Sequence, residues 1–280
     1  MRKMMRAALA LLVALTLLFG TSIAEEKPLL EVHQLNVGCA NCYLIKYGET
    51  SFMIDCGIDQ EITAPLVDEY LAAADIGKLD ACIITHYHRD HIRNMNRVLA
   101  GFGDENTVVY GPSKGFYNND YLPFAAGYYR QMVNYDQLQL GDVHLTCVGP
   151  TDTKGGGNIN KDSLNILLTY GSHRFLFTGD YVRSVDVMEQ HEELLRDVDV
   201  MQFPHHGLEP FCVDGWALER INPKTIIVPG GFGGNVEKLL RQRKMGDTQV
   251  LDTTKGNLVF LSDGAQMEIY TYVQPGQFAQ

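Results

Sequence analysis

The stretch "LDACIITHYHRDH", residues 79–91, places four candidate metal donors directly after a short apolar run. His86 and His88 are two residues apart, so in an extended segment their side chains point to the same side. A helix is predicted to begin near Asp90, where an acid suits the positive end of the helix dipole. Imidazoles and carboxylates are donors that zinc prefers, and four of them so close together, His91 included, can serve two metals. The apolar strand before them disfavours the alternative of a histidine cluster in a surface loop.

Two later segments add donors at the ends of apolar strands. "FLFTGDY", residues 175–181, ends a predicted strand in a glycine followed by Asp180. Glycine permits close backbone approach at a strand end, and Asp180 is a candidate for a carboxylate that bridges two metals. "VDVMQFPHHGLEP", residues 198–210, ends another apolar strand in His205 and His206. We expect at least one of these two histidines to bind metal or to act in catalysis.

Together these motifs resemble the metallo-β-lactamase superfamily. The first segment stands at its H-x-H-x-D-H motif, Asp180 at its bridging aspartate, and His205 with His206 at its late histidine motif. The stretch "HQLNVGCANCYLIKYGETSFMIDCG", residues 33–57, is similar to the opening strands, with their Asp-x-Gly turn. The likeness covers essentially the whole chain after the N-terminal segment.

Within the superfamily, the chain most resembles the hydrolase domain of the competence protein ComEC. This likeness rests on "NVGCANCYLI" (residues 36–45), "DSLNILLTYGSHRFLFTGD" (162–180) and "DVDVMQFPHHG" (197–207). The same layout resembles the secreted phosphorylcholine esterases. Both resemblances imply a hydrolase that acts on phosphodiesters.

The resemblance also implies a set of metal donors, drawn from all three segments: His86, His88, Asp90, His91, Asp180, His205 and His206. One metal would be held by His86, His88 and Asp180 with a water. The second metal would be held by Asp90, His91, Asp180 and one histidine of the late pair. The other histidine of that pair would contact the substrate or donate a proton. Candidate catalytic residues are therefore Asp90, His205 and His206, and the expected cofactor is two zinc ions, with manganese as an alternative.

The sequence departs from the pattern of the superfamily in three ways. Residues 92–94 are Ile-Arg-Asn where Gly-Gly often follows the first motif. His88 stands where ComEC-type sequences often carry an acid, which makes this site richer in histidine. Many members also carry a separate histidine between the first motif and the bridging acid. The two histidines available here are His144, in a predicted strand, and His173, in a predicted turn, and neither has that context.

Apolar runs and helical patterns alternate along the chain, and strands cluster at both ends of each half. This order predicts an α/β fold of two sheets packed face to face with helices outside, a four-layer αββα sandwich. We expect one domain over residues 25–280. A helix is predicted after the first motif, with Ile92, Met95, Val98 and Leu99 on one face. The aromatic segment from about residue 111 to 140 is interpreted as an insert of loop and helix.

The N-terminal segment, residues 1–24, has the order of a secretory signal peptide: basic "MRKMMR", an apolar run and small residues before Glu25. An uncleaved membrane anchor is the alternative. We expect cleavage and a secreted or cell-envelope location, without stable membrane insertion after cleavage. Cleavage removes Arg2, Lys3 and Arg6 but no acid, which leaves 20 basic and 34 acidic residues and a net charge of −14.

This acidic balance disfavours nucleic acid as a partner, because a polyanion is repelled unless a local basic patch compensates. The expected substrate is a small-molecule or cell-wall phosphodiester. A tyrosine-rich segment, with Tyr117, Tyr121, Tyr128 and Tyr129, could hold a quaternary ammonium group by cation–π contact. Packing of these tyrosines is the plainer interpretation.

The chain has six cysteines, an even number that in an exported protein invites disulfides. Cys82 and Cys147 lie in strand-like runs, so we expect them to be buried thiols. Cys39 and Cys42 form one C-x-x-C pair without a second, which argues against a structural zinc knuckle. A local bridge between those two stays open.

The sequence thus predicts a secreted hydrolase with two metals, acting on phosphodiesters through a water activated by zinc. A lactonase or β-lactamase that cleaves a carbon-centred ester or amide is the alternative among enzymes. A metal-retaining binding module without catalysis is the alternative outside them. Retention of the full donor set argues against such a module.

Overall fold

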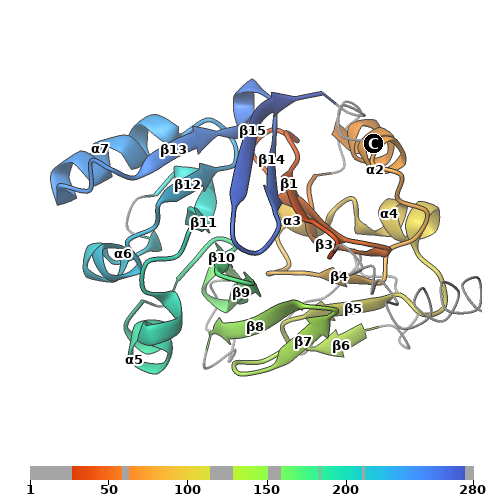
Figure 1. Ribbon diagram of the computed structural model, residues 1–280, viewed down its shortest axis with the longest axis horizontal. Helices are drawn as coiled ribbons and strands as arrows, with labels where there is room; N and C mark the ends of the chain where they lie inside the picture. The colour runs from red at the N-terminus through yellow and green to blue at the C-terminus, as the bar shows by residue number, and fades with distance from the viewer. Residues whose placement is uncertain are drawn as a thin grey trace, which may run out of the picture.

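Two mixed β-sheets pack face to face, and helices cover their outer faces (Figure 1). The computed structural model describes residues 27–58, 63–113, 129–150, 159–182, 184–209 and 212–274. The expected signal peptide, residues 1–24, lies outside the described residues. The four-layer αββα sandwich predicted from the sequence is confirmed.

The first sheet combines an antiparallel half with a parallel half. Its strands in spatial order are β15 (Met267–Val273), β14 (Asn257–Ser262), β1 (Leu30–Gln34), β2 (Cys42–Tyr47), β3 (Thr50–Cys56), β4 (Ala81–Ile83), β5 (Val108–Gly111) and β6 (Tyr129–Gln131). The strands β3 to β6 run parallel to one another. Their carboxyl ends therefore meet at one edge of the sandwich.

The second sheet has the same mixed character. Its strands in spatial order are β13 (Gln249–Asp252), β12 (Thr225–Val228), β11 (Val200–Gln202), β10 (His173–Phe177), β9 (Asn165–Tyr170), β8 (Val143–Gly149) and β7 (Gln137–Leu140). The strands β10 to β13 are parallel, so the segments that follow β10 and β11 leave the sheet at the same edge.

Apolar side chains fill three layers. The central layer lies between the sheets, where the rings of Tyr43 and Phe177 meet edge to face and those of Phe175 and Phe260 do the same. Burial of such large rings is the main stabilising term of a sandwich core. Two further layers join each sheet to its helices.

Helices α2 (Thr63–Ala73), α3 (Arg89–Ile92) and α4 (Met95–Phe102) belong to the first sheet. Helices α5 (Ser184–Leu195), α6 (Gly215–Ile221) and α7 (Gly233–Arg243) cover the second. Short 3-10 turns are η2 (Ile159–Asp162), η3 (Pro204–Gly207) and η5 (Thr253–Lys255). Across these described ranges, every helix is too short or too polar to cross a membrane.

Three expectations from the sequence need correction. The helix after the first motif is broken into α3 and α4 around Asn94, although Ile92, Met95 and Val98 are buried as predicted. Residues 114–128 of the predicted insert lie outside the described residues, and residues 129–140 contain β6 and β7 where a loop and a helix were expected. In β7 the glutamines are exposed and the leucines partly buried, which is the period of a strand at a sheet edge. His173 opens β10 instead of lying in a turn.

All six cysteines are free thiols. Cys82 and Cys147 are fully buried, as the sequence predicts. The alternative of a bridge between Cys39 and Cys42 is wrong, because Cys39 is exposed and Cys42 is buried, and both are free.

Candidate metal centre

Three segments meet at the edge where the parallel strands of both sheets end. The first histidine motif follows β4, Asp180 follows β10, and the late histidine pair follows β11. A hydrogen bond of 2.9 Å from the backbone N–H of Leu164 to the carbonyl of Thr85 links the two sheets beside them. The seven expected donors are thus brought to one place by strands of different sheets.

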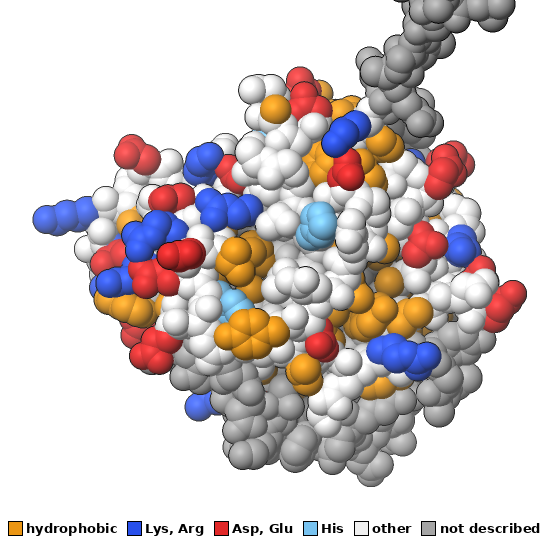
Figure 2. Space-filling model, turned by 60° about the horizontal axis from the view of Figure 1, so that its bottom comes forward, with side chains coloured by type: hydrophobic (Ala, Val, Ile, Leu, Met, Phe, Trp, Pro, Cys, Tyr) orange, Lys and Arg blue, Asp and Glu red, His pale blue; other side chains and the backbone are white. Residues whose placement is uncertain are grey.

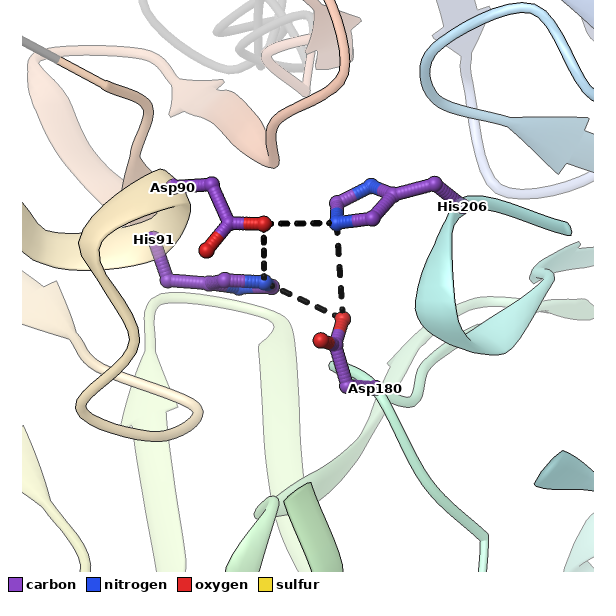
Figure 3. A group of neighbouring side chains, drawn as sticks. All are labelled: Asp90, His91, Asp180 and His206. Carbon is purple, nitrogen blue, oxygen red and sulfur yellow. Dashed lines mark hydrogen bonds and ion pairs between the residues drawn. The ribbon is translucent and has the colours of Figure 1, made fainter. Parts of the chain in front are cut away.

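The first group of donors contains Asp90, His91, Asp180 and His206 (Figure 3). Nε2 of His206 lies 3.0 Å from Oδ2 of Asp90 and 3.7 Å from Oδ1 of Asp180. Nε2 of His91 lies 3.1 Å from Oδ1 of Asp180 and 3.8 Å from Oδ2 of Asp90. Donors of a tetrahedral zinc ion lie about 3.3 Å apart when the metal–donor bonds are about 2.0 Å. The four atoms therefore suit one small divalent cation.

The second group contains His86, His88 and Asp180. Nε2 of His86 lies 3.1 Å from Nδ1 of His88 and 3.4 Å from Oδ2 of Asp180. The two imidazoles reach the same side, as the alternation of an extended segment predicts. Asp180 thus faces the first group with Oδ1 and the second with Oδ2, which is the arrangement that a bridging carboxylate needs.

The late histidines point in different directions. His206 is buried in the first group, whereas the side chain of His205 is 22% exposed and belongs to neither group. Nε2 of His205 lies 3.8 Å from Oδ2 of Asp180, and the two histidine rings are 6.2 Å apart. The alternation of side chains along a strand does not explain this difference, because β11 already ends at Gln202.

A left-handed turn causes this divergence. His205 has φ 51° and His206 has φ 56°, and Gly207 continues at φ 78°. Each non-glycine residue in this region costs on the order of 1–3 kcal/mol, and such strain concentrates at functional sites. The side-chain amide of Asn235 donates to the carbonyl of Gly207 at 3.1 Å and helps to hold the turn.

The backbone around Asp180 is crowded. Gly179 has φ 58°, and a Cβ there would lie 2.9 Å from the side chain of Thr85. The N–H of Asp180 donates to Oγ of Ser163 at 3.1 Å, and Nε2 of Gln202 donates to the carbonyl of Gly179 at 2.7 Å. The glycine before the acid is therefore required by both conformation and space, as the sequence indicated.

Asp55 is a member of the site that sequence reasoning did not assign. Its Oδ2 lies 2.6 Å from Nδ1 of His91, and it also accepts from the backbone N–H of Thr85 at 2.8 Å and from its hydroxyl at 2.7 Å. A carboxylate on one ring nitrogen fixes the tautomer and aims the other nitrogen at the metal position. The signal in the sequence was the acid at the end of "FMIDC", whose strand β3 runs parallel to β4.

A bound metal would satisfy buried polar atoms that otherwise make no hydrogen bond. Nε2 of His91 and Oδ1 of Asp180 are both buried and face each other at 3.1 Å, but neither atom makes a hydrogen bond of good geometry. Asp180 is a carboxylate with 1% of its side chain exposed, and a buried charge needs an opposite charge close by. A cation among these donors would meet both needs, so the residues present fit a divalent metal.

The charges of the metal-free site are strongly coupled. Burial lowers the pKa of His86 and, with the neighbouring His86 ring, lowers the pKa of His88 to about 4. Burial also opposes the charged form of His91, but Asp180 and Asp55 outweigh it and raise its pKa well above the usual value. Against its burial, His91 and His86 hold the pKa of Asp180 well below its usual value. Near neutral pH, His86 and His88 are therefore neutral donors, as metal binding requires.

The sequence profile of the metallo-beta-lactamase superfamily matches residues 35–230, which include every donor of both groups. The chain belongs to this superfamily. His144 and His173 belong to neither donor group: His144 lies in β8, and His173 hydrogen-bonds Ser262 at 2.6 Å. The second group therefore has three donors within the described residues.

Three curated relatives are similar to the chain over 49–68% of its length. ComE operon protein 3 of Bacillus subtilis (strain 168) is 24% identical over 203 residues, which are 68% of this chain and 25% of that protein. Hydroxyacylglutathione hydrolase of Aeromonas salmonicida (strain A449) is 28% identical over 141 residues, 49% of this chain and 44% of that protein. UPF0173 metal-dependent hydrolase of Anaeromyxobacter dehalogenans (strain 2CP-C) is 25% identical over 210 residues, 67% of this chain and 73% of that protein. The chain thus spans 25% of the length of the first relative and 44% of the length of the second.

The fold is also similar to that of a solved structure, the metallo-beta-lactamase fold protein YhfI from Bacillus subtilis. The TM-score is 0.56 at 19% identity, with 84% of this chain and 100% of that chain covered. At this identity the likeness concerns the fold alone. The superfamily assignment therefore rests on the match over residues 35–230, and one of the relatives is named as a metal-dependent hydrolase.

Proposed function

We propose that this hydrolase cleaves phosphodiesters with two metal ions held by the two donor groups. The observation that carries the proposal is the unequal completeness of the groups around Asp180. The first group has four protein donors, whereas the second has His86, His88 and one oxygen of Asp180. The more open group leaves room for an oxygen of the phosphate beside the attacking water.

Two zinc ions in such a site supply a water that is activated near neutral pH and positive charge for the phosphoryl oxygens. The residues of the chain position the metals and their donors. Asp180 spans both groups and sets their spacing, while Asp55 keeps Nε2 of His91 directed at Oδ1 of Asp180. Manganese is a second candidate metal, because carboxylate and imidazole donors also suit it.

His205 is the proposed proton donor to the leaving oxygen. It is partly exposed, and its Nε2 is directed towards Oδ2 of Asp180 at 3.8 Å. Nδ1 of the same ring hydrogen-bonds a carboxylate oxygen of Glu209 at 3.1 Å, which holds the ring in this orientation. Asp90 and His206, the other two proposed catalytic residues, act by holding metal in the first group.

Small or cell-wall phosphodiesters are the proposed substrates, and nucleic acid is disfavoured. Residues 25–280 carry a net charge of −14. On the face that Figure 2 shows, basic and acidic side chains are interspersed at the end formed by α6 and α7, where Arg243 pairs with Glu219 and Arg241 with Glu237. Paired charges of both signs give no stripe that would follow a polyanion.

The proposed choline contact involves a tyrosine group that lies mostly outside the described residues. Its described member, Tyr129, hydrogen-bonds the hydroxyl of Tyr87 at 2.6 Å. Tyr87 lies between His86 and His88, so the start of β6 is tied to the first histidine motif. This contact lies beside the first histidine motif and supports a role for Tyr129 in substrate selection.

A carbon-centred hydrolase is the second candidate. The likeness to a hydroxyacylglutathione hydrolase favours it, since that relative is 28% identical over 49% of this chain. The absence of a separate third histidine in the second group, among the described residues, weighs against it. We propose further that the protein is exported, because residues 1–24 have the order of a secretory signal.

The test is an activity panel on purified protein, reconstituted with zinc or manganese and compared with chelator-treated protein. The substrates are bis-p-nitrophenyl phosphate, p-nitrophenyl phosphorylcholine, single-stranded DNA, nitrocefin and a thioester of glutathione. Metal-dependent turnover of the first two, above the rest, is expected. Rapid turnover of nitrocefin or the thioester beside inert phosphodiesters would overturn the substrate assignment. Inactivity towards the whole panel would favour a binding module.

A further inference from the structure

A third group of donors lies beside the two around Asp180. It consists of His205, Glu209 and Cys212. Nδ1 of His205 lies 3.1 Å from Oε2 of Glu209 and 3.6 Å from Sγ of Cys212, and Sγ of Cys212 lies 3.6 Å from Oε2 of Glu209. Three atoms of three different donor types therefore converge on one point.

This convergence differs from that of a nucleophilic triad. In a triad the acid holds one nitrogen of the imidazole, and the opposite nitrogen takes the proton of the nucleophile. Here Glu209 and Cys212 both face Nδ1 of His205, while Nε2 faces Asp180. Burial and the charge of Glu209 also raise the pKa of the Cys212 thiol to about 12, which leaves it a poor nucleophile.

The spacing matches what a tetrahedral zinc ion requires. Zinc binds nitrogen and oxygen at about 2.0–2.1 Å and sulfur at about 2.3 Å, so tetrahedral donors lie about 3.3 Å apart for nitrogen and oxygen and about 3.5 Å apart for pairs with sulfur. The measured separations are 3.1, 3.6 and 3.6 Å. We propose that His205, Glu209 and Cys212 form a separate binding site for a thiophilic divalent cation such as zinc.

The backbone holds the three residues in place. The N–H of Cys212 donates to the carbonyl of Glu209 at 3.1 Å, and the N–H of Val182 donates to the carbonyl of Cys212 at 3.0 Å. The second bond ties the thiol to the segment that carries Asp180. Cys212 is 3% exposed, whereas the side chain of Glu209 is 46% exposed. The site thus has an open side through which a metal enters and on which a water completes the coordination.

The donor types also select the cation. A thiolate with an imidazole and one carboxylate suits zinc, cobalt or cadmium, whereas magnesium and calcium require several oxygens. Binding displaces the thiol proton to solvent and forms a metal–sulfur bond without any change of oxidation state. The site therefore needs no oxidant.

Occupancy has a consequence that rests on the proposed function. A cation on Nδ1 of His205 replaces the hydrogen bond to Glu209 and withdraws electrons from the ring, which removes its role in proton transfer. The third site then acts as an inhibitory site. Zinc beyond the amount that fills the two groups around Asp180 is expected to lower the rate of hydrolysis.

Titration with cobalt under a non-thiol reductant tests the site without any need for activity. The wild-type protein is expected to develop a near-ultraviolet absorption from thiolate-to-cobalt charge transfer. In Cys212→Ser this absorption is expected to vanish, with one equivalent of bound cobalt lost. Cys39→Ser is the matched control. Cys39 is an exposed thiol close enough to Asp90 and Asp180 for their charges to act on it, but it lies outside the third donor group. This variant is expected to keep the absorption.

A second variant protects the test against misfolding of Cys212→Ser. Glu209→Gln keeps the shape but removes the charge, and it is expected to weaken cobalt binding at this site on the order of tenfold or more, with the thiolate absorption appearing at higher cobalt. A thiolate absorption that is missing in wild type, or that survives in folded Cys212→Ser, would overturn the site. If the cobalt titration confirms the site but excess zinc slows wild type and Cys212→Ser to the same extent, the inhibitory role is wrong and the site remains.

Discussion

Nδ1 of His91 and Oδ2 of Asp55 lie 2.6 Å apart, and both side chains are completely buried. The same ring presents Nε2 to Asp180 at 3.1 Å. One carboxylate thus orients the imidazole, and another shares its metal position. The pair joins the end of β3 to helix α3, two elements that the chain order alone does not place together.

Asp55→Asn is expected to lower metal affinity or the rate of hydrolysis by about 10- to 100-fold. The substitution removes the carboxylate charge that orients the His91 ring through Nδ1. Competition with a chromogenic chelator measures the affinity. Glu31→Gln is the matched control, since Glu31 lies 3.1 Å from the buried His33, which is in none of the three donor groups. Unchanged metal affinity in folded Asp55→Asn would show that Asp55 only supports the loop.

His205→Ala and His206→Ala are expected to differ, because His206 lies in the first donor group and His205 lies outside it. The His206 variant should lose metal. The His205 variant should keep metal at the two groups and lose rate by about 10²–10⁴-fold. Elemental analysis with kinetics at saturating metal separates the two effects. Because His205 also belongs to the third donor group, the comparison is made at an amount of zinc that fills only the two groups around Asp180. Equal metal loss from these two groups in both variants would contradict the division of roles.

The stability of the chelator-treated protein is expected to be highest near pH 6.5–7. The pKa of His88 falls from 6.5 in the unfolded chain to about 4, so between these values the unfolded state binds more protons and stability rises with pH. His86 acts in the same direction. The raised pKa of His91 stabilises the fold below 6.5, and this contribution is lost as pH rises through the folded value.

Thermal unfolding from pH 4 to 9 in the presence of chelator measures this profile. His88→Asn is expected to flatten the rise in stability between pH 4 and 6.5, because only His86 then contributes to it. A profile with the same slope in the variant would contradict the assignment of that slope to the buried histidines.

Export predicts that the mature chain begins near Glu25, after the small residues that end the apolar segment. The intact mass of protein recovered from culture medium or cell envelope measures the cut. Protein that still carries Met1 would contradict cleavage and favour the anchor.

The sequence was informative wherever a donor stands at the end of an apolar strand. The four candidate donors of the first motif, Asp180 and the late histidines were predicted from such strand ends and from the resemblance to the superfamily, and the sandwich follows from the order of strands and helices. Asp55 follows the same rule, but its partner His91 depends on the parallel pairing of β3 with β4. Pairing between strands distant in sequence is not encoded in a local pattern.

The third donor group escaped the sequence for a different reason. Glu209 and Cys212 come close to Nδ1 of His205 only because His205 and His206 adopt left-handed backbone angles. Non-glycine residues rarely adopt these angles, so no propensity predicts them. Likewise, the helical spacing of the apolar residues does not show that α3 ends and α4 begins around the buried Asn94.

The most direct test of the account is the metal content of Asp180→Ala. Because Oδ1 of Asp180 faces the first donor group and Oδ2 faces the second, its removal is expected to lower occupancy at both. Asp199→Ala is the control, since Asp199 is a buried carboxylate that pairs with Lys224 outside the donor groups. Elemental analysis after dialysis against limiting zinc should give about two equivalents fewer in Asp180→Ala than in Asp199→Ala. Equal metal content in the two folded variants would contradict a dinuclear centre bridged by Asp180.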